Sequence, residues 1–162
     1  MLKAVADATA FCVGILDVMS VNDLLAELRQ LNLPEGEYVV FGSGPMEIHG
    51  IRKAGDLDLL ITGTLWDVLV AQGHQPKVDD WEFDDADGIH RQIHTEQIKI
   101  GNIEMYREWG YIKETPAEVI ADADIYEGIR FGKLAYVLES KRNFNRPKDK
   151  IDVKLIEDYL SN

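Results

Sequence analysis

The stretch 41-FGSGPMEIHGIRKAGDLDLLIT-62 decides the fold prediction for this chain. It ends in an apolar run that carries two aspartates, Asp56 and Asp58, and a Gly-Ser-Gly turn stands upstream at residues 42–44. Successive side chains on a β-strand point to opposite faces. We therefore predict a strand over 56–61 with both aspartates on one face and the neighbouring leucines on the other.

Two carboxylates placed in this way need a partner. Ionised carboxylates about 6 Å apart repel each other by roughly 3 kcal/mol at an effective dielectric near 20. Either one of them takes up a proton, or a cation lies between them. Mg²⁺ prefers hard oxygen ligands and substrate phosphates, and Mn²⁺ is similar in this respect. Asp56 and Asp58 therefore predict a divalent-cation site.

The glycine-rich turn fits the same site. Gly42 and Ser43 lie between a β-type run at 38–41 and a short helix predicted from Gly44 to Gly50. Glycine lets the backbone approach a ligand closely, and N–H groups at the start of a helix attract anions. The turn and the aspartates together predict a bound polyphosphate. The alternative is an ordinary turn followed by two solvated aspartates at the end of a strand.

The order Gly-Ser, about a dozen residues, then Asp-hydrophobic-Asp resembles the signature of the nucleotidyltransferase superfamily typified by DNA polymerase beta, above all its small, minimal members. The resemblance implies transfer of a nucleoside monophosphate from a nucleoside triphosphate to a hydroxyl by a two-metal mechanism. It makes Gly42 and Ser43 the triphosphate-binding turn, and Asp56 and Asp58 the first two metal ligands. Gly55 departs from the serine that commonly precedes the first aspartate in this family.

The resemblance also calls for a third carboxylate between apolar residues on a neighbouring strand. Glu104, in Ile-Glu-Met, is the best match and is assigned as metal ligand or base. An exposed glutamate on an edge strand is its alternative interpretation.

The C-terminal part of the chain resembles the small members as well. They often carry a helix with a lysine, here Lys141, and then an Arg-Pro-Lys-Asp segment, here 146–149. We assign Lys141, together with Lys148 or Arg52, to the charge of the leaving pyrophosphate. A plain helix salt bridge from Lys148 to Asp152 is the alternative for that lysine.

Local patterns predict an α+β fold, in which a small mixed sheet is flanked by helices (the nucleotidyltransferase fold) and the C-terminal third is helical. We treat 1–162 as a single domain, with N-terminal helices over 1–35, the catalytic sheet region over 36–110 and C-terminal helices over 115–162. Capping patterns begin helices at Ser20, Thr64 and Thr115. Helices are expected over 5–19, 21–32, 64–73, 133–143 and 148–160, strands over 38–41 and 56–61, and a hairpin over 98–106, while 78–95 is acidic and is not assigned.

Composition limits the choice of function. No segment has the eighteen or so apolar residues of a membrane span, and the lone Cys12 excludes an intrachain disulfide, so a cytoplasmic protein is expected. The net charge of −12 disfavours long nucleic acid. Residues 130–154 nevertheless hold eight basic residues against three acidic ones, which suits a small polyphosphate or simply a solvated helix face.

The acceptor stays open: a small molecule, a protein side chain and an RNA end all fit the resemblance, as do an antibiotic-modifying enzyme and the toxin of a toxin–antitoxin pair. A non-catalytic nucleotide- or partner-binding module on the same fold is the alternative function, and a homodimer is compatible with the sequence. The aromatic residues Trp81, Tyr106, Trp109 and Tyr111 suit either a base or acceptor pocket or the core. His90 and His94 stand four apart, but their alternating, strand-like surroundings disfavour a zinc site.

Overall fold

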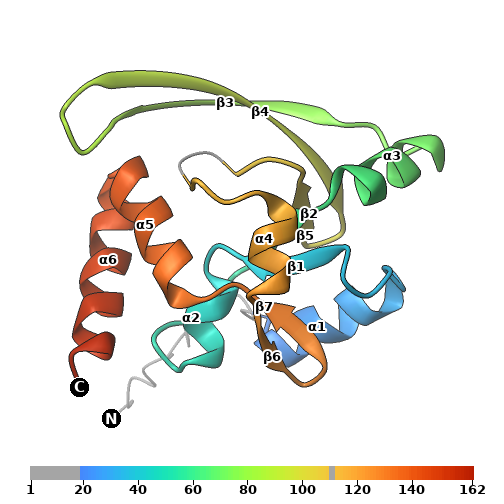
Figure 1. Cartoon of the computed structure of the whole chain (residues 1–162), viewed down its shortest axis with the longest axis horizontal. Helices are drawn as coiled ribbons and strands as arrows, with labels where there is room; N and C mark the ends of the chain where they lie inside the picture. The colour runs from blue at the N-terminus through green and yellow to red at the C-terminus, as the bar shows by residue number, and fades with distance from the viewer. Residues whose placement is uncertain (1–18, 110–111) are drawn as a thin grey trace, which may run out of the picture.

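The computed structural model describes residues 19–109 and 112–162, and these form six α-helices and one seven-stranded mixed sheet (Figure 1). The α+β prediction is therefore confirmed, although the sheet is larger than expected. In chain order the elements are α1 (Val21–Gln30), β1 (Tyr38–Phe41), α2 (Gly44–Ile48), β2 (Leu57–Ile61), α3 (Gly63–Ala71), β3 (Lys77–Asp84), β4 (His90–Ile100), β5 (Ile103–Tyr106), α4 (Pro116–Ala121), β6 (Asp124–Tyr126), β7 (Ile129–Phe131), α5 (Leu134–Phe144) and α6 (Pro147–Leu160).

The sheet has the strand order β3-β4-β5-β2-β1-β7-β6. β2 lies in its centre, antiparallel to β1 and parallel to β5. In this register Asp58 stands beside Phe41 of β1 on one side and beside Glu104 of β5 on the other. Two carboxylates that are 46 positions apart in the sequence are thus neighbours across a parallel strand pair.

Each face of the central sheet carries its own hydrophobic core. Leu57, Leu59 and Ile61 pack on one face with side chains from α1 and α3. Leu60 belongs to the opposite core, with side chains from α4, α5 and α6. The alternation predicted for this strand is confirmed, because Asp58 lies on the Leu60 face, where the apolar core gives way to polar residues.

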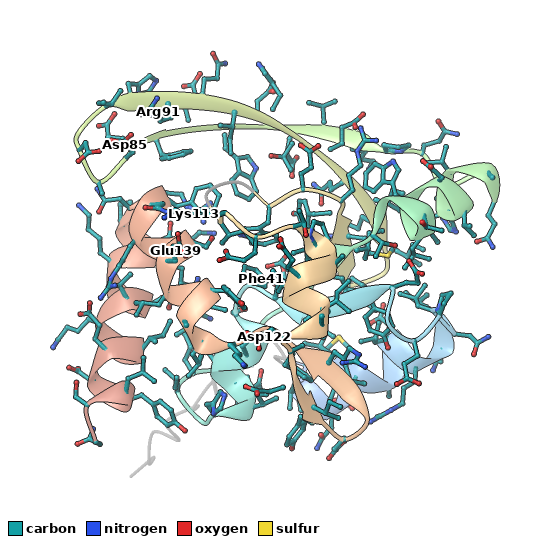
Figure 2. The ribbon with its side chains drawn as sticks, in the orientation of Figure 1. Phe41, Asp85, Arg91, Lys113, Asp122 and Glu139 are labelled. Atoms are coloured by element: carbon teal, nitrogen blue, oxygen red, sulfur yellow. The ribbon has the colours of Figure 1, made fainter. Side chains whose placement is uncertain are left out.

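The acidic segment that the sequence left unassigned forms most of a long hairpin, β3–β4, which arches over the rest of the molecule (Figure 1). At its tip the Asp85 carboxylate accepts hydrogen bonds from the Ile89 N–H and the Arg91 guanidinium (Figure 2). The Asn145 side chain, between α5 and α6, donates to the Asp85 carbonyl at 3.2 Å. The hairpin is therefore attached at its tip as well as at its base.

Several local predictions need correction. Thr62, not Thr64, caps α3, because the Thr62 hydroxyl accepts from the Leu65 N–H. β2 begins one residue after Asp56, and α2 ends at Ile48 rather than Gly50. The C-terminal third is not wholly helical: β6 and β7 form a hairpin there, turning at Glu127 and Gly128, which both have positive φ.

Other local predictions are confirmed. Ser20 and Thr115 form capping boxes with the carboxylates three residues later. The hairpin at 98–106 turns at Gly101-Asn102 as expected, and α5 and α6 begin within one residue of their predicted starts. The helix predicted over 5–19, with Cys12, lies outside the described residues apart from its last position. Among the helices described, none has the length and apolar character needed to cross a membrane.

Candidate functional site

One cavity collects the residues that the sequence singled out. It has a volume of about 240 Å³ and opens on the Asp58 face of the sheet. β2, β5, the turn after β1, the loop before β2, and α5 and α6 all contribute to its wall. All eight predicted site residues line it: Gly42, Ser43, Arg52, Asp56, Asp58, Glu104, Lys141 and Lys148.

Gly42 is required by the close approach of the turn to Asp58. The residue has φ +61°, a conformation that side chains other than glycine rarely adopt. A Cβ atom at this position would stand 2.2 Å from Oδ2 of Asp58. The glycine thus brings the backbone of the Gly-Ser turn against the carboxylate, which the spacing of the motif alone does not show.

Asp58 is a carboxylate without a counter-ion. It makes no hydrogen bond or ion pair with any residue that the structure describes, and Asp56 makes none either. Burial raises the pKa of Asp58 to about 7, and the charges of Asp56 and Glu104 add to the rise more than Lys141 and Lys148 offset it. The local field therefore favours either a proton or a cation at this position.

Glu104 is engaged by protein groups. Its Oε1 accepts from the Lys99 ammonium at 2.5 Å, and its Oε2 accepts from the Tyr106 hydroxyl at 3.1 Å. The Glu104 side chain is only 18% exposed, and β5 lies between β4 and β2, so the alternative of an exposed edge-strand glutamate is wrong. Within 19–109 and 112–162, no three His, Cys, Asp or Glu side chains already converge in a way that could hold a metal ion.

Lys99 is the protein's own cation beside Glu104. Its hydrogen bond to Glu104 is the main cause that raises the pKa of the lysine, and the charges of Asp56 and Asp58 raise it further. The residue follows from the sequence in hindsight, since a two-residue turn at 101–102 pairs Lys99 with Glu104. Sequence reasoning missed it because the cross-strand partners of Glu104 were not considered.

The wall of the cavity opposite Asp58 carries basic side chains, and most of them form ion pairs with aspartates of α6. Asp152 accepts from Arg52 Nε at 2.6 Å and lies 2.7 Å from Lys141 Nζ. The fully buried Asp149 is held by Arg146 at 2.5 Å. Asp152 therefore pairs with Arg52 and Lys141 rather than with Lys148, so the predicted alternative of a Lys148–Asp152 helix pair is wrong.

The pKa of Asp152 is set by burial and by its cationic partners, which act in opposite directions. Desolvation alone would raise the pKa of Asp152, and the hydrogen bonds from Arg52 and Lys141 outweigh it and hold the pKa below its ordinary value. Lys148 is exposed and makes no ion pair in the described part of the chain. Arg52 and Lys141 are paired with Asp152, so of the three predicted basic residues only Lys148 has a charge that no carboxylate of the described chain balances.

Aromatic rings complete the cavity. Trp81 from the hairpin, Tyr106 and Trp109 all line it, while Tyr111 lies outside the described residues. The Arg146 guanidinium stacks 4.9 Å above the Trp81 ring. Trp109 packs edge-on against Phe41 and donates from Nε1 to the Ser140 hydroxyl at 2.8 Å. These rings thus pack against other aromatic side chains and also face the cavity.

The two histidines are each paired with an aspartate across the β3–β4 hairpin. His90 and His94 lie on the strand β4, and each ring pairs with an aspartate of β3, Asp84 and Asp80 respectively.

No protein-family model, no curated protein and no solved structure matches the chain. Function must therefore be argued from the cavity itself.

Proposed function

We propose that this protein is a metal-dependent nucleotidyltransferase of the DNA polymerase beta-like type, which moves a nucleoside monophosphate from a nucleoside triphosphate to an acceptor hydroxyl. One observation carries the proposal. Asp56 and Asp58 lack any counter-ion among the described residues, and they face a cavity whose other wall bears Lys141 and Lys148. A cavity with unpaired carboxylates on one wall and basic side chains on the other suits a polyanion such as a triphosphate, together with a divalent cation that the carboxylates bind.

The chemistry of the aspartate pair, Asp56 and Asp58, suits a divalent cation. The raised pKa of Asp58 is the sign of a negative charge that the protein does not balance. When bound, Mg²⁺ or Mn²⁺ would neutralise Asp56 and Asp58 and polarise the phosphoryl group under attack. Glu104 would be the third oxygen ligand or the base, in a state in which Lys99 no longer holds its carboxylate.

The protein residues then have separate tasks. The turn at Gly42 and Ser43 holds the triphosphate against Asp58, and the ammonium of Lys148 attracts the β- and γ-phosphates. The acceptor oxygen forms a bond to the α-phosphorus, and the bond from that phosphorus to the bridging oxygen breaks. Pyrophosphate leaves with the electron pair, and the proton of the acceptor passes to Glu104.

The test is nucleotidyl transfer by the double variant Asp56→Asn/Asp58→Asn. We expect pyrophosphate release, measured with each of the four common nucleoside triphosphates and Mg²⁺ or Mn²⁺, to disappear in this variant while the circular dichroism spectrum is unchanged. Asp67→Asn is the matched control, because Asp67 is exposed on α3 and does not line the cavity. Unchanged release in the double variant would refute the proposal.

A non-catalytic nucleotide-binding module is the second candidate, and the state of Glu104 favours it. The carboxylate is held by Lys99 and Tyr106, so the third ligand is not free in this arrangement. Calorimetry with ATP and Mg²⁺, followed by the pyrophosphate assay, separates the two functions. Binding at the cavity without release for any acceptor tried would establish the module.

A further inference from the structure

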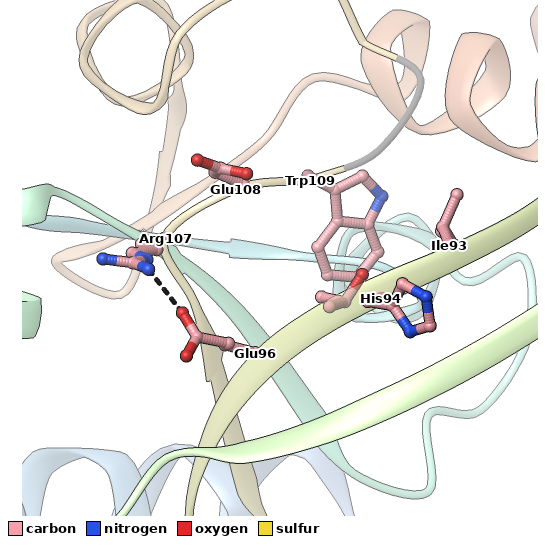
Figure 3. A pocket seen from close by; sticks show the side chains of 7 residues that line it. Ile93, His94, Glu96, Arg107, Glu108 and Trp109 are labelled. Carbon is pink, nitrogen blue, oxygen red and sulfur yellow. Dashed lines mark hydrogen bonds and ion pairs between the residues drawn. The ribbon is translucent and has the colours of Figure 1, made fainter.

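A second cavity adjoins the first and has no role in the function proposed above. Its volume is about 290 Å³, and it lies between β4 and the segment that follows β5 (Figure 3). Trp109 lines both cavities, so the second cavity adjoins the one that holds Asp58 at this residue. A transferase needs two adjoining sites, one for the donor and one for the acceptor.

A free strand edge borders this second cavity. β4 pairs with β3 from His90 to Gln97, but it pairs with β5 only from Ile98 to Ile100. Residues 90–97 therefore have one edge without a strand partner among the described residues. Ile93, His94, Thr95 and Glu96 lie on this stretch and line the cavity, and Arg107 and Glu108 face them.

The direction of the backbone groups follows from the ladder. The two-residue turn makes Ile100 and Ile103 a hydrogen-bonded pair, so in β4 every second residue from Ile100 points its N–H and C=O toward the β5 side. At the hairpin tip, the N–H of Asp85 donates to the carbonyl of Ile89, which places the odd-numbered residues on the β3 side. His94 and Glu96 consequently direct their backbone groups to the free edge.

The charged side chains that line the second cavity limit which kind of ligand can bind there. Glu108 makes no ion pair in the part of the chain that the structure describes, and Glu96 already binds Arg107, as the dashed line in Figure 3 marks. Arg107, the only lysine or arginine among the residues that line the cavity, is thus paired with Glu96, and the His94 ring is paired with Asp80. A phosphodiester chain would meet an unpaired carboxylate and no available cation, whereas a neutral or basic segment meets a complementary surface.

We propose that an extended segment of a protein adds to the free edge of β4 as a further strand, and that it presents a serine, threonine or tyrosine hydroxyl past Trp109 to the donor nucleotide. Backbone hydrogen bonds to His94 and Glu96 supply the affinity, and the cavity accommodates side chains of the segment. This inference rests on the proposed function and names its acceptor class. The hydroxyl oxygen forms the new bond to the α-phosphorus, pyrophosphate leaves with the electron pair, and Glu104 receives the proton.

Peptide binding without nucleotide tests the docking site by itself. The probe is a fluorescent peptide of about ten residues that alternates valine with threonine between lysines, a length that covers the free edge. We expect fluorescence anisotropy to report binding that weakens about tenfold in His94→Pro, because the proline removes a donor from the free edge and no donor from the β3 ladder. Glu82→Pro is the matched control, because it removes a donor from the outer edge of β3 and does not line the cavity, and it should bind as the unaltered protein does.

N-methylated probes remove any dependence on the folding of the proline variant. Methylation of alternate peptide nitrogens in one phase should abolish binding to the unaltered protein, while methylation in the other phase should leave it intact. Equal effects of both phases, or no binding of any probe, would overturn the inference, as would an analytical ultracentrifugation result in which a second copy of this chain occupies the edge.

Transfer is then measured with the bound probe, ATP labelled at the α-phosphate and Mg²⁺. Labelled peptide is the expected result. Pyrophosphate release to other acceptors with no labelled peptide would overturn the acceptor assignment and leave the proposed function standing. Edge-specific peptide binding without pyrophosphate release to any acceptor would refute the proposed function, and the acceptor role with it.

Discussion

Two groups of carboxylates lie in or beside the same cavity and differ in their partners. Asp149 and Asp152, on α6, are buried and are each held by two cationic groups, counting the longer 3.8 Å contact from Lys141 to Asp149. Asp58, on β2, and Asp56 before it have no partner of this kind in the described chain. The pKa of Asp152 is consequently lowered, while that of Asp58 is raised to about 7.

The paired and the unpaired carboxylates have opposite effects on the stability of the fold. Paired buried carboxylates hold α6 against the loop before β2 and against α5, so their free energy of interaction contributes to folding. An unpaired carboxylate contributes nothing of this kind and weakens the fold at neutral pH. The protein's own cations thus balance Asp149 and Asp152, while Asp56 and Asp58 stay unbalanced, which is the feature on which the proposed metal site rests.

The largest expected loss of stability comes from removing one of the paired carboxylates, Asp152. Asp152→Ala leaves the cations of Arg52 and Lys141 without their carboxylate, and we expect a loss of about 3 kcal/mol in the free energy of unfolding at pH 7. Urea denaturation measures it. Asp158→Ala is the control, because Asp158 pairs with Lys154 on the exposed surface of α6, and it should cost less than about 1 kcal/mol. Equal losses would remove the contrast between the two groups.

The second prediction concerns Asp58, where removal of the carboxylate should stabilise the fold rather than destabilise it. The unfolded chain ionises this carboxyl near its ordinary pKa of 3.8, whereas the folded protein keeps the proton until about pH 7. The folded state therefore binds more protons between about pH 4 and 7, and its stability falls as pH rises through this range. Asp58→Asn removes that loss, so the variant should exceed the unaltered protein in stability at pH 8 by an amount on the order of a few kcal/mol.

The same titration controls metal binding. Mg²⁺ or Mn²⁺ must displace the proton of Asp58, so the increase in melting temperature caused by either ion should be larger at pH 8 than at pH 6. Asp58→Asn should abolish this increase at both pH values. A rise in melting temperature that is equal at the two pH values would show that the ion binds elsewhere.

A pair of glycines sharpens the comparison at the cavity. Gly42→Ala and Gly50→Ala both place alanine at positive φ, +61° and +71°, and we expect a similar cost of about 1 kcal/mol from backbone strain alone. Only at position 42 does the new Cβ meet the Asp58 carboxylate; at position 50 it meets nothing within 4 Å. Metal-dependent stabilisation should therefore be lost in Gly42→Ala and retained in Gly50→Ala.

The smallest effect concerns the available cation. Lys148→Ala should leave stability unchanged and weaken binding of Mg²⁺ and ATP by about fivefold, which corresponds to one exposed charge contact. Lys150→Ala, an exposed lysine of the same helix that does not line the cavity, is the matched control. Isothermal titration calorimetry measures both, and equal affinities in the two variants would exclude Lys148 from the phosphate site.

Local sequence signals predicted much of the fold. The capping boxes at Ser20 and Thr115, the two-residue turn at 101–102 and the alternation of Leu57 and Leu59 depend on neighbours a few residues away, and all appear in the structure. The hairpin β3–β4 was missed because its outer face is charged and solvated, so its apolar pattern is weak. A cross-strand ladder, not hydrophobic periodicity, defines it.

The sequence by itself determined which residues could form the site: the Gly-Ser turn, the two aspartates, Glu104 and the basic residues of the last two helices. Only the tertiary structure decided how they are balanced. Parallel pairing of β2 with β5 brings Glu104 to Asp58, and the docking of α6 gives Arg52 and Lys141 to Asp152 rather than to the cavity. The reason is physical, since the charge state of a carboxylate depends on burial and on partners that are distant in the sequence, and neither is encoded in local spacing.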